Sequence, residues 1–295
     1  MKNTSKNITR NATQDLDSFN EDELGYTTRV LIQALFPYRR SDHDKVVRQM
    51  GTTQITIHSL KGLPYGKYPR LIMAYLITEA VKRKNLPTDE ARKIPMGSSM
   101  NDFMRKMGLA SRSTGGRNGN LKNIRDQMRR IASSTITVEQ LLDKNRDLGT
   151  KLDIVKSWDL WYHHNPEQGC LDESYIILSE EFFQEIIAHP IPIDLGILKS
   201  LSKPRSMDVY IWATARKYVL KYPLSLTWAQ VQRQFAPETP HTAEGRKSFK
   251  QKFRATIAEV QALWPEMGLE VTSEGIVLHP GQPSISSRRH YKELR

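Results

Sequence analysis

One segment occurs twice in this sequence, as KYPRLIMAYLITEAVKRK at residues 67–84 and as SKPRSMDVYIWATARKYVLK at residues 202–221. Aligned on their prolines, the copies share five identical residues: Pro69/Pro204, Arg70/Arg205, Tyr75/Tyr210, Ala80/Ala215 and Lys82/Lys217. Each copy predicts a helix that opens with proline, because the first helical position needs no backbone N–H. The repeat therefore predicts two halves built on the same plan.

The length and composition fit two medium-sized domains. The chain has 295 residues, and 38% of them are aliphatic or aromatic, whereas one domain commonly has about 100–150 residues. We expect a flexible N-terminal arm, a first domain, a second domain and a polar tail, over residues 1–20, 21–189, 190–280 and 281–295. No run approaches the ~20 apolar residues of a membrane span. The polar N-terminus has no apolar signal region, so a cytoplasmic protein is expected.

Local patterns in the first half predict an ordered series of elements. Residues 22–36 have the pattern of an amphipathic helix, and residues 54–60 alternate as in a strand. After the first copy we expect a helix at 99–107 capped by Ser98 or Ser99, a basic helix at 121–131, strands at 134–142, 151–162 and 174–179, and a helix at 180–188. Two prolines within residues 189–192 mark the expected domain boundary.

The second half repeats this order. We expect a short helix near 194–201, then the second copy, a helix from Thr227 to Phe235, a basic helix at 246–264, and a hairpin of LEVT (269–272) and IVLH (276–279). Each half thus runs long helix, short helix, loop, basic helix, hairpin. This is the order of a winged helix, a helix-turn-helix followed by a β-hairpin. The sequence predicts an α+β fold with two tandem winged-helix domains.

The charge is positive and concentrated in two places. Lysine and arginine number 44 against 32 acidic residues, a net charge of +12. Residues 105–130 contain eight basic side chains and one acid, Asp126, and residues 246–254 contain five basic side chains and no acid. One basic cluster in each half favours a polyanionic partner that both halves contact.

The second basic helix separates an apolar face from a polar one. Steps of four, four, three and four residues place five apolar side chains on one face: Phe249, Phe253, Ile257, Val260 and Trp264. The opposite face carries Lys247, Lys250, Gln251 and Arg254, and Arg246 precedes them at the start of the helix. Arginine and lysine reach guanine or phosphate, and glutamine pairs with adenine, so these residues are candidate DNA contacts. The alternative is a solvated charged face, although such faces normally mix both signs.

The first basic helix has the same division. Its apolar stripe is Leu121, Ile124, Met128 and Ile131, and its candidate DNA contacts are Arg117, Asn118, Lys122, Arg125 and Arg129. The glycine-rich loop at 113–117 would present free N–H groups to a phosphate near the helix N-terminus. The loop lacks the Walker spacing and its Gly-Lys-Ser/Thr ending, so ATP binding is not predicted.

Neither a metal, a cofactor nor a catalytic group is predicted. The adjacent His163 and His164 would point to opposite faces of a strand, and the single cysteine, Cys170, excludes a disulfide within the chain and a multi-cysteine zinc site. The chain also contains no evident pairing of a nucleophile with a base. The sequence favours binding over catalysis.

Three segments resemble the RepA-type replication initiators of bacterial plasmids. They are GLPYGKYPRLIMAYLITEAVKRK (62–84), STGGRNGNLKNIRDQMRR (113–130) and PRSMDVYIWATARKYVLKYPLSLTWAQVQRQF (204–235). The resemblance implies two winged-helix domains that bind repeated sequences, called iterons, in double-stranded plasmid origin DNA. It also implies recruitment of the host initiator, helicase and chaperones, and a homodimer that represses in equilibrium with a monomer that initiates. The first domain would contain the dimer interface.

Two other classes of protein stay open. A winged-helix transcriptional repressor would share the fold but bind only its own operator. A relaxase or primase would need a catalytic tyrosine with a histidine cluster, or an acidic metal site, and Tyr65, Tyr162 and Tyr175 lack such neighbours in the sequence.

Overall fold

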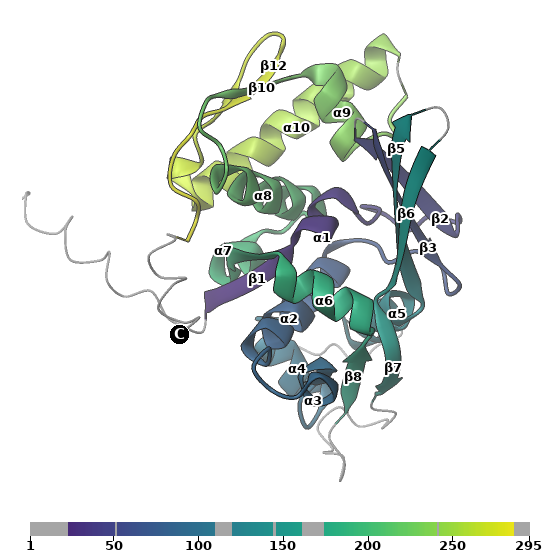
Figure 1. Cartoon of the computed structure of the whole chain (residues 1–295). Helices are drawn as coiled ribbons and strands as arrows, with labels where there is room; N and C mark the ends of the chain where they lie inside the picture. Colours follow the sequence, from purple (N-terminus) through teal and green to yellow (C-terminus); the bar gives the residue numbers. More distant parts are fainter. Residues whose placement is uncertain are drawn as a thin grey trace, which may run out of the picture.

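The two copies of the repeated segment form helices that meet in the middle of the molecule. The computed structural model describes residues 23–50, 52–109, 120–143, 146–160, 174–240 and 242–285. The first copy is α2 (Lys67–Lys82) and the second is α8 (Pro204–Lys217), so both predicted helices are confirmed. The other elements are arranged around this pair (Figure 1).

The described residues contain both helix and strand in each half, as the sequence predicts. The remaining elements of the first half are β1 (Leu24–Thr28), α1 (Arg29–Gln33), β2 (Lys45–Met50), β3 (Thr53–Ser59), α3 (Thr88–Arg92), β4 (Lys93–Pro95), α4 (Met100–Lys106), α5 (Asn120–Ala132), β5 (Ser134–Asp143), β6 (Arg146–Asp153), β7 (Val155–Asp159), β8 (Tyr175–Leu178) and α6 (Glu180–Ala188). The helix predicted at 99–107 is α4, and the hydroxyl of Ser99 caps it by accepting from the Asp102 N–H.

The second half contains every predicted element in the predicted order, and it has two strands, β9 and β10, that the sequence did not predict. Its remaining elements are β9 (Pro190–Asp194), α7 (Leu195–Ser200), β10 (Leu224–Thr227), α9 (Trp228–Phe235), α10 (Ala243–Leu263), a short 3-10 helix (Pro265–Met267), β11 (Leu269–Val271) and β12 (Gly275–Leu278). Thr227 caps α9 through a capping box with Gln230, as its position in the sequence suggests.

The same three-stranded arrangement occurs in both halves. In the second half, β12 lies between β10 and β11 and is antiparallel to both. In the first half, β8 lies between β4 and β7 and is antiparallel to both. In each case the first strand follows the repeated helix, and the other two follow the basic helix. The repeat therefore extends beyond the helices to the sheets.

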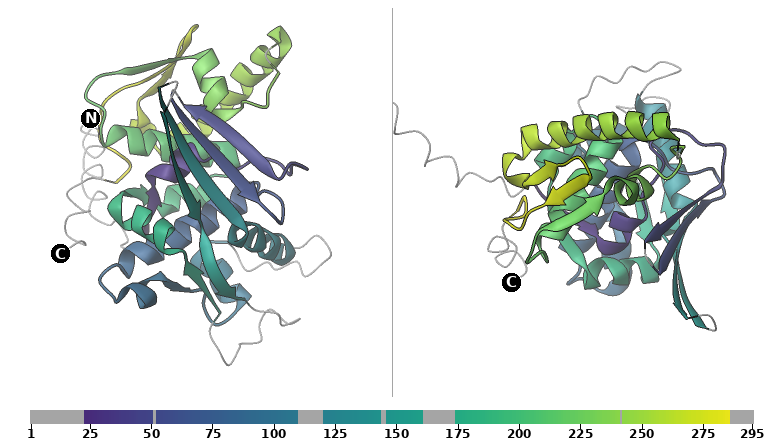
Figure 2. Two further views of the ribbon diagram at one scale, coloured as in Figure 1. Left: turned by 45° about the vertical axis from the view of Figure 1, so that its right-hand side comes forward. Right: turned by 90° about the horizontal axis from the view of Figure 1, so that it is seen from above.

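The hairpin expected directly after the first basic helix belongs to a different sheet. β5 and β6 pair with each other, but they extend β2 and β3 into a four-stranded sheet of order β2-β3-β5-β6, best seen in Figure 2. The strand predicted over 151–162 is also interrupted, because β6 ends before the fully buried Ile154 and β7 begins after it. Alternation identifies a strand but not its partner, so the change of sheet is invisible in the sequence.

The helix predicted over residues 22–36 is largely wrong. Residues 24–28 form β1, which pairs antiparallel with β9, and only Arg29–Gln33 are helical. The segment at 189–192, expected to separate the domains, thus begins a strand that ties the start of the first half to the second. Pro190 and Pro192 lie two residues apart, so their missing N–H groups face the same edge of β9.

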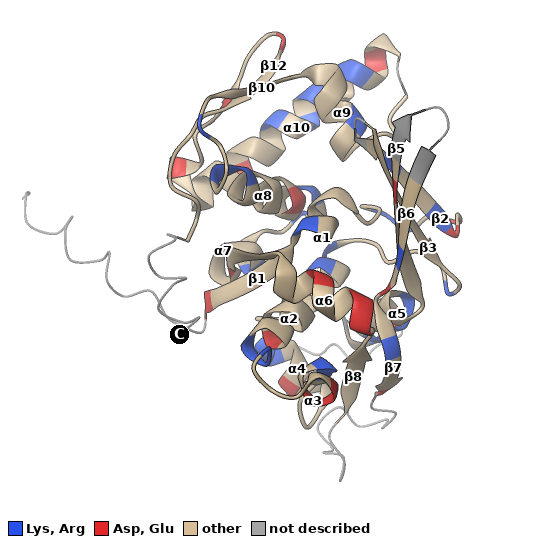
Figure 3. Cartoon of the chain, viewed as in Figure 1, with Lys and Arg blue, Asp and Glu red and all other residues tan. Residues whose placement is uncertain are grey.

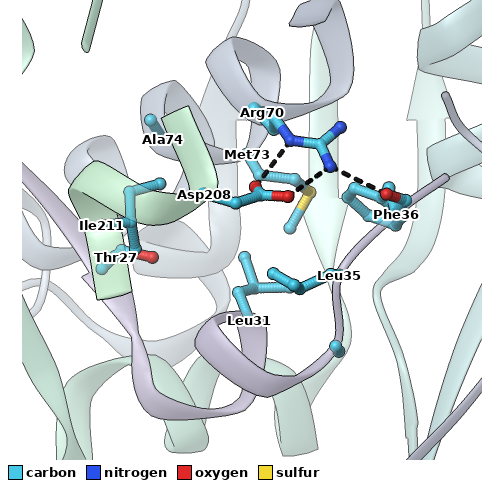
Figure 4. Close-up of a pocket in the computed structure, with 10 residues that line it drawn as sticks. Thr27, Leu31, Leu35, Phe36, Arg70, Met73, Ala74, Asp208 and Ile211 are labelled. Atoms are coloured by element: carbon cyan, nitrogen blue, oxygen red, sulfur yellow. Dashed lines mark hydrogen bonds and ion pairs between the residues drawn. The ribbon is translucent and has the colours of Figure 1, made fainter. Parts of the chain in front are cut away.

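A buried ion pair joins the two repeated helices. The guanidinium of Arg70 donates from Nε and Nη2 to the carboxylate of Asp208, at 2.7 Å for each bond, and both side chains are 4% exposed. Arg70 also donates to the carbonyls of Gly66 and Phe36. The pair borders a cavity of about 30 Å³ between α1, α2 and α8, which is lined mostly by apolar side chains (Figure 4).

Tyr38 lies between the equivalent arginines of the two copies. Arg70 is 5.2 Å and Arg205 is 4.9 Å from the centre of its ring. Burial, followed by the nearby Asp208 carboxylate, raises the pKa of the Tyr38 hydroxyl above its usual range. The phenol is therefore neutral, and it presents a ring face that attracts both guanidinium groups.

Glu259 attaches α10 to the beginning of α8. Its carboxylate accepts hydrogen bonds from the Ser202 N–H and from the Ser202 and Ser206 hydroxyls, and it lies 3.3 Å from Lys203 Nζ. Partial burial opposes ionisation, but these bonds outweigh it and hold the pKa of Glu259 below its usual range.

Removing the Glu259 carboxylate should make the stability of the fold less dependent on pH. A lowered folded-state pKa means that Glu259 stabilises the fold fully above about pH 4.3, and that this contribution is lost as the pH falls through the folded-state value. The melting temperature of Glu259→Gln should lie below the wild-type value near neutral pH, and the difference should shrink toward pH 2. Glu266→Gln, at an exposed carboxylate, controls for the removed charge. A difference that is constant with pH would contradict the assignment.

Candidate nucleic-acid interface

The second basic helix, α10, is longer than predicted. It begins at Ala243 because the hydroxyl of Thr242 accepts from the Gly245 N–H at 3.1 Å and caps the first turn. It ends at Leu263, just before Pro265. The expected start at residue 246 missed this cap because the segment resembles a loop rich in proline and threonine.

The predicted division of α10 into two faces is confirmed. The apolar side chains, all 4% exposed or less, are Phe249, Phe253, Ile257, Val260 and Trp264. They pack on α8 and α9: Trp264 meets Tyr210 edge to face with ring centres 5.9 Å apart, and Phe253 meets Phe235 at 5.3 Å. The repeated helix α8 is therefore the support on which α10 rests.

The polar side of α10 faces solvent. Arg246, Lys247, Gln251 and Arg254 are exposed, and Lys250 is half-buried. Blue segments mark the N-terminal part of α10 in Figure 3. This helix presents a row of cations and one amide on a rigid element, as a surface that binds nucleic acid requires.

Trp228, which the sequence did not single out, connects this polar side to the rest of the half. The Nζ atom of Lys250 and the Cζ atom of Arg254 each lie 5.5 Å from the centre of its ring. The indole Nε1–H donates to the carbonyl of Ser273, in the turn between β11 and β12. The one signal in the sequence that could have drawn attention to Trp228 is its position directly after Thr227, the N-cap of α9.

The first basic helix, α5, has a weaker version of the same pattern. Ile124, Met128 and Ile131 are buried as predicted, while Leu121 is half-buried. Among its candidate contacts, Lys122 and Arg129 are exposed and Arg125 is half-buried. The other two candidates, Arg117 and Asn118, lie outside the described residues.

The one acid of the first basic cluster lies on α5 itself and binds an arginine outside the candidate set. The Asp126 carboxylate accepts from Arg130 Nε at 2.7 Å, and Arg130 also donates to the carbonyl of Leu63 and stacks on Tyr65. This arginine is 11% exposed and holds the helix against the segment before α2. Asp126 therefore helps to fix α5 in the fold through Arg130, while Lys122 and Arg129 are exposed to solvent.

Two further features concern the described part of the chain. Within it, no group of three or more histidine, cysteine or carboxylate side chains is arranged to hold a metal ion. His163, His164 and Cys170 lie outside the described residues. None of the described helices is both long enough and apolar enough to cross a bilayer.

Solved structures with a similar fold come from RctB. A crystal structure of a selenomethionine derivative of domains 2 and 3 of RctB has a TM-score of 0.54 at 12% identity, and covers 85% of this chain and 97% of that one. A second crystal structure of RctB domains 2–3 has a TM-score of 0.53 at 12% identity, with coverage of 90% and 99%. At this identity the likeness concerns the fold alone.

The comparison of sequences is more specific. No curated relative matches the chain. The family model described as plasmid encoded RepA protein matches residues 63–230, more than half of the chain, and this range includes both copies of the repeat and the beginning of α9. The resemblance noted in the sequence is confirmed: the chain belongs to the family of plasmid-encoded RepA proteins.

Proposed function

We propose that this protein initiates plasmid replication by binding repeated sequences (iterons) in double-stranded origin DNA through two winged-helix domains. The observation that carries this proposal is the row of exposed cations and Gln251 on α10, a helix firmly packed on its own half. Family membership supports the replication role. The domains would span residues 21–189 and 190–280.

The order of elements supports the winged-helix assignment. In the second half, α8, β10, α9, α10, β11 and β12 run as helix, strand, two helices and hairpin, and β10 pairs with the last strand. The first half has α2, β4, α4, α5, β7 and β8 in the same order and pairing, with α3 and the β5–β6 hairpin inserted. In a helix-turn-helix the second helix enters the major groove. The corresponding helices here are α5 and α10.

Two such domains in tandem favour DNA with direct repeats. Major-groove segments on one face of a duplex recur about every 34–36 Å. One reading helix in each half would therefore contact two successive turns. Arg117, Asn118, Lys122, Arg125 and Arg129 would contact DNA from the first domain, and Arg246, Lys247, Lys250, Gln251 and Arg254 from the second.

The test is binding to the DNA that flanks this gene. We expect a labelled duplex containing the flanking repeats to bind at least about 10³-fold more tightly than a scrambled duplex at the same salt concentration. Equal affinity for both duplexes would contradict sequence-specific binding. Deletion of the gene should abolish plasmid maintenance. A deletion that changes only transcription would identify a repressor instead.

The family resemblance supports a further part of the proposal. The protein would be cytoplasmic, exchange between a homodimer and a monomer, and recruit the host initiator, helicase and chaperones. Sedimentation across a range of protein concentrations, with and without repeat DNA, tests the exchange. A single species under all conditions would contradict it.

Replacement of Arg254 distinguishes base reading from phosphate contact. Arg254→Ala should weaken binding to the repeat by ~1–3 kcal/mol if the guanidinium contacts a guanine. Its affinity for scrambled DNA should then stay close to the wild-type value. Competition titrations with both duplexes measure the two effects, and equal loss on both would assign Arg254 to the backbone.

A further inference from the structure

Trp228 is fixed at the point where α9, α10 and the β11–β12 turn meet. It is the first residue of α9 and is 6% exposed. Its backbone N–H donates to the carbonyl of Glu274 and its Nε1–H to the carbonyl of Ser273, both at 3.0 Å. Two bonds to one turn, from opposite ends of the residue, fix both the position and the plane of the indole ring.

The ring contacts both faces of α10. Phe249 and Phe253, from the buried face, meet it edge to face with ring centres 6.3 Å apart. Lys250 and Arg254, from the polar side, place their charged groups 5.5 Å from its centre. These two cations are four residues apart, so one turn of helix brings both to the same ring.

Long basic side chains lose rotamer freedom when they bind a phosphate or a base, and this loss opposes binding. A ring that already attracts the charged group limits that freedom before DNA arrives, and tryptophan is the most effective ring for this purpose. The geometry thus prepares two cations for one ligand.

We propose that Trp228 is a positioning residue for DNA binding, which holds Lys250 and Arg254 in the conformation that contacts the duplex. This inference rests on the proposed function, and it adds a residue that contacts no DNA. The loss of DNA affinity caused by replacing Trp228 should therefore depend on the presence of Lys250 and Arg254. A tryptophan that served only the core would act independently of them.

Trp212 provides the matched control. It is 1% exposed and packs edge to face on Phe235, with ring centres 5.8 Å apart, in the same half. Among the described residues, no lysine or arginine lies over its ring. Trp212→Leu should therefore lower the melting temperature and leave DNA affinity within about twofold, since the change is structural only.

The experiment is a double-mutant cycle on repeat DNA, measured at a temperature where every variant is folded. Trp228→Leu should weaken binding about tenfold, and Trp228→Phe about threefold because a weaker ring remains. In the Lys250→Ala/Arg254→Ala background, both losses should fall to within about twofold. If Trp228→Leu does not fold, the Trp228→Phe cycle decides in the same way.

Equal losses in both backgrounds would overturn the proposal and leave Trp228 as a core residue. Unchanged affinity for Trp228→Leu would overturn it as well. If the wild-type protein shows no preference for the repeat DNA, the proposed function fails, which is a different result from the failure of the cycle.

Discussion

Asp208→Ala should lower the free energy of unfolding by ~3–5 kcal/mol, because it leaves a buried guanidinium without its counter-charge. Arg70 keeps its bonds to the carbonyls of Gly66 and Phe36, but loses both bonds to the carboxylate. Urea denaturation of the wild type and the variant measures this loss. We expect a lower midpoint, together with loosened contact between α2 and α8.

The double variant Arg70→Met/Asp208→Leu is the control. It removes both charges and fills a similar volume, so its stability should lie much closer to the wild-type value than that of Asp208→Ala. If Asp208→Ala unfolds within about 1 kcal/mol of the wild type, the pair does not hold the repeated helices together.

The triple variant Lys247→Ala/Lys250→Ala/Arg254→Ala should bind repeat DNA at least about 100-fold more weakly, since each cation that reads a base or phosphate contributes substantially. Three lost phosphate contacts would also lower the slope of log affinity against log salt by about 2.7. Lys247 and Arg254 are exposed, Lys250 is half-buried, and none of the three belongs to the apolar core, so the melting temperature should change little. Anisotropy titrations at several salt concentrations give both quantities.

The triple variant Lys45→Ala/Lys82→Ala/Lys93→Ala is the control. It removes three positive charges, as the first triple variant does, but from exposed positions on β2, α2 and β4. It should cause a much smaller loss of DNA affinity, because none of these elements is a proposed reading helix. Equal losses for the two triple variants would indicate general attraction of a basic protein to DNA and would contradict the assignment to α10.

Helices and their faces were predictable from the sequence because the responsible interactions are local. The apolar spacing of α10, the cap at Thr227 and the proline at the start of α8 each depend on residues within a few positions of one another. The same holds for the buried and exposed sides of α5. The candidate contacts could therefore be assigned to faces before their surroundings were known.

Long-range pairing was not predictable. β1 reads as the beginning of an amphipathic helix, and only its partner β9, more than 160 residues away, makes it a strand. The ion pair between Arg70 and Asp208 joins residues 138 apart, and Asp208 aligns with Met73 in the first copy, so the repeat does not indicate the pair. Trp228 was missed for a related reason: its role depends on cations from another helix and on a carbonyl from the hairpin turn.

The side chains that α2 and α8 share have structural roles in the fold. The arginine shared by both copies does not face the candidate DNA surface, since Arg70 and Arg205 converge on the ring of Tyr38 between the halves. The shared tyrosine supports each half, Tyr75 against Phe103 and Tyr210 against Trp264. The repeat supplies the scaffold, and α5 and α10 supply the candidate contacts.

A footprint on the DNA that flanks this gene tests the central claim most directly. Two reading helices in tandem predict protection of about two helical turns on one face of each repeat, with major-groove contacts ~34–36 Å apart. Protection of a single short half-site, or none, would contradict a protein that reads DNA with both halves.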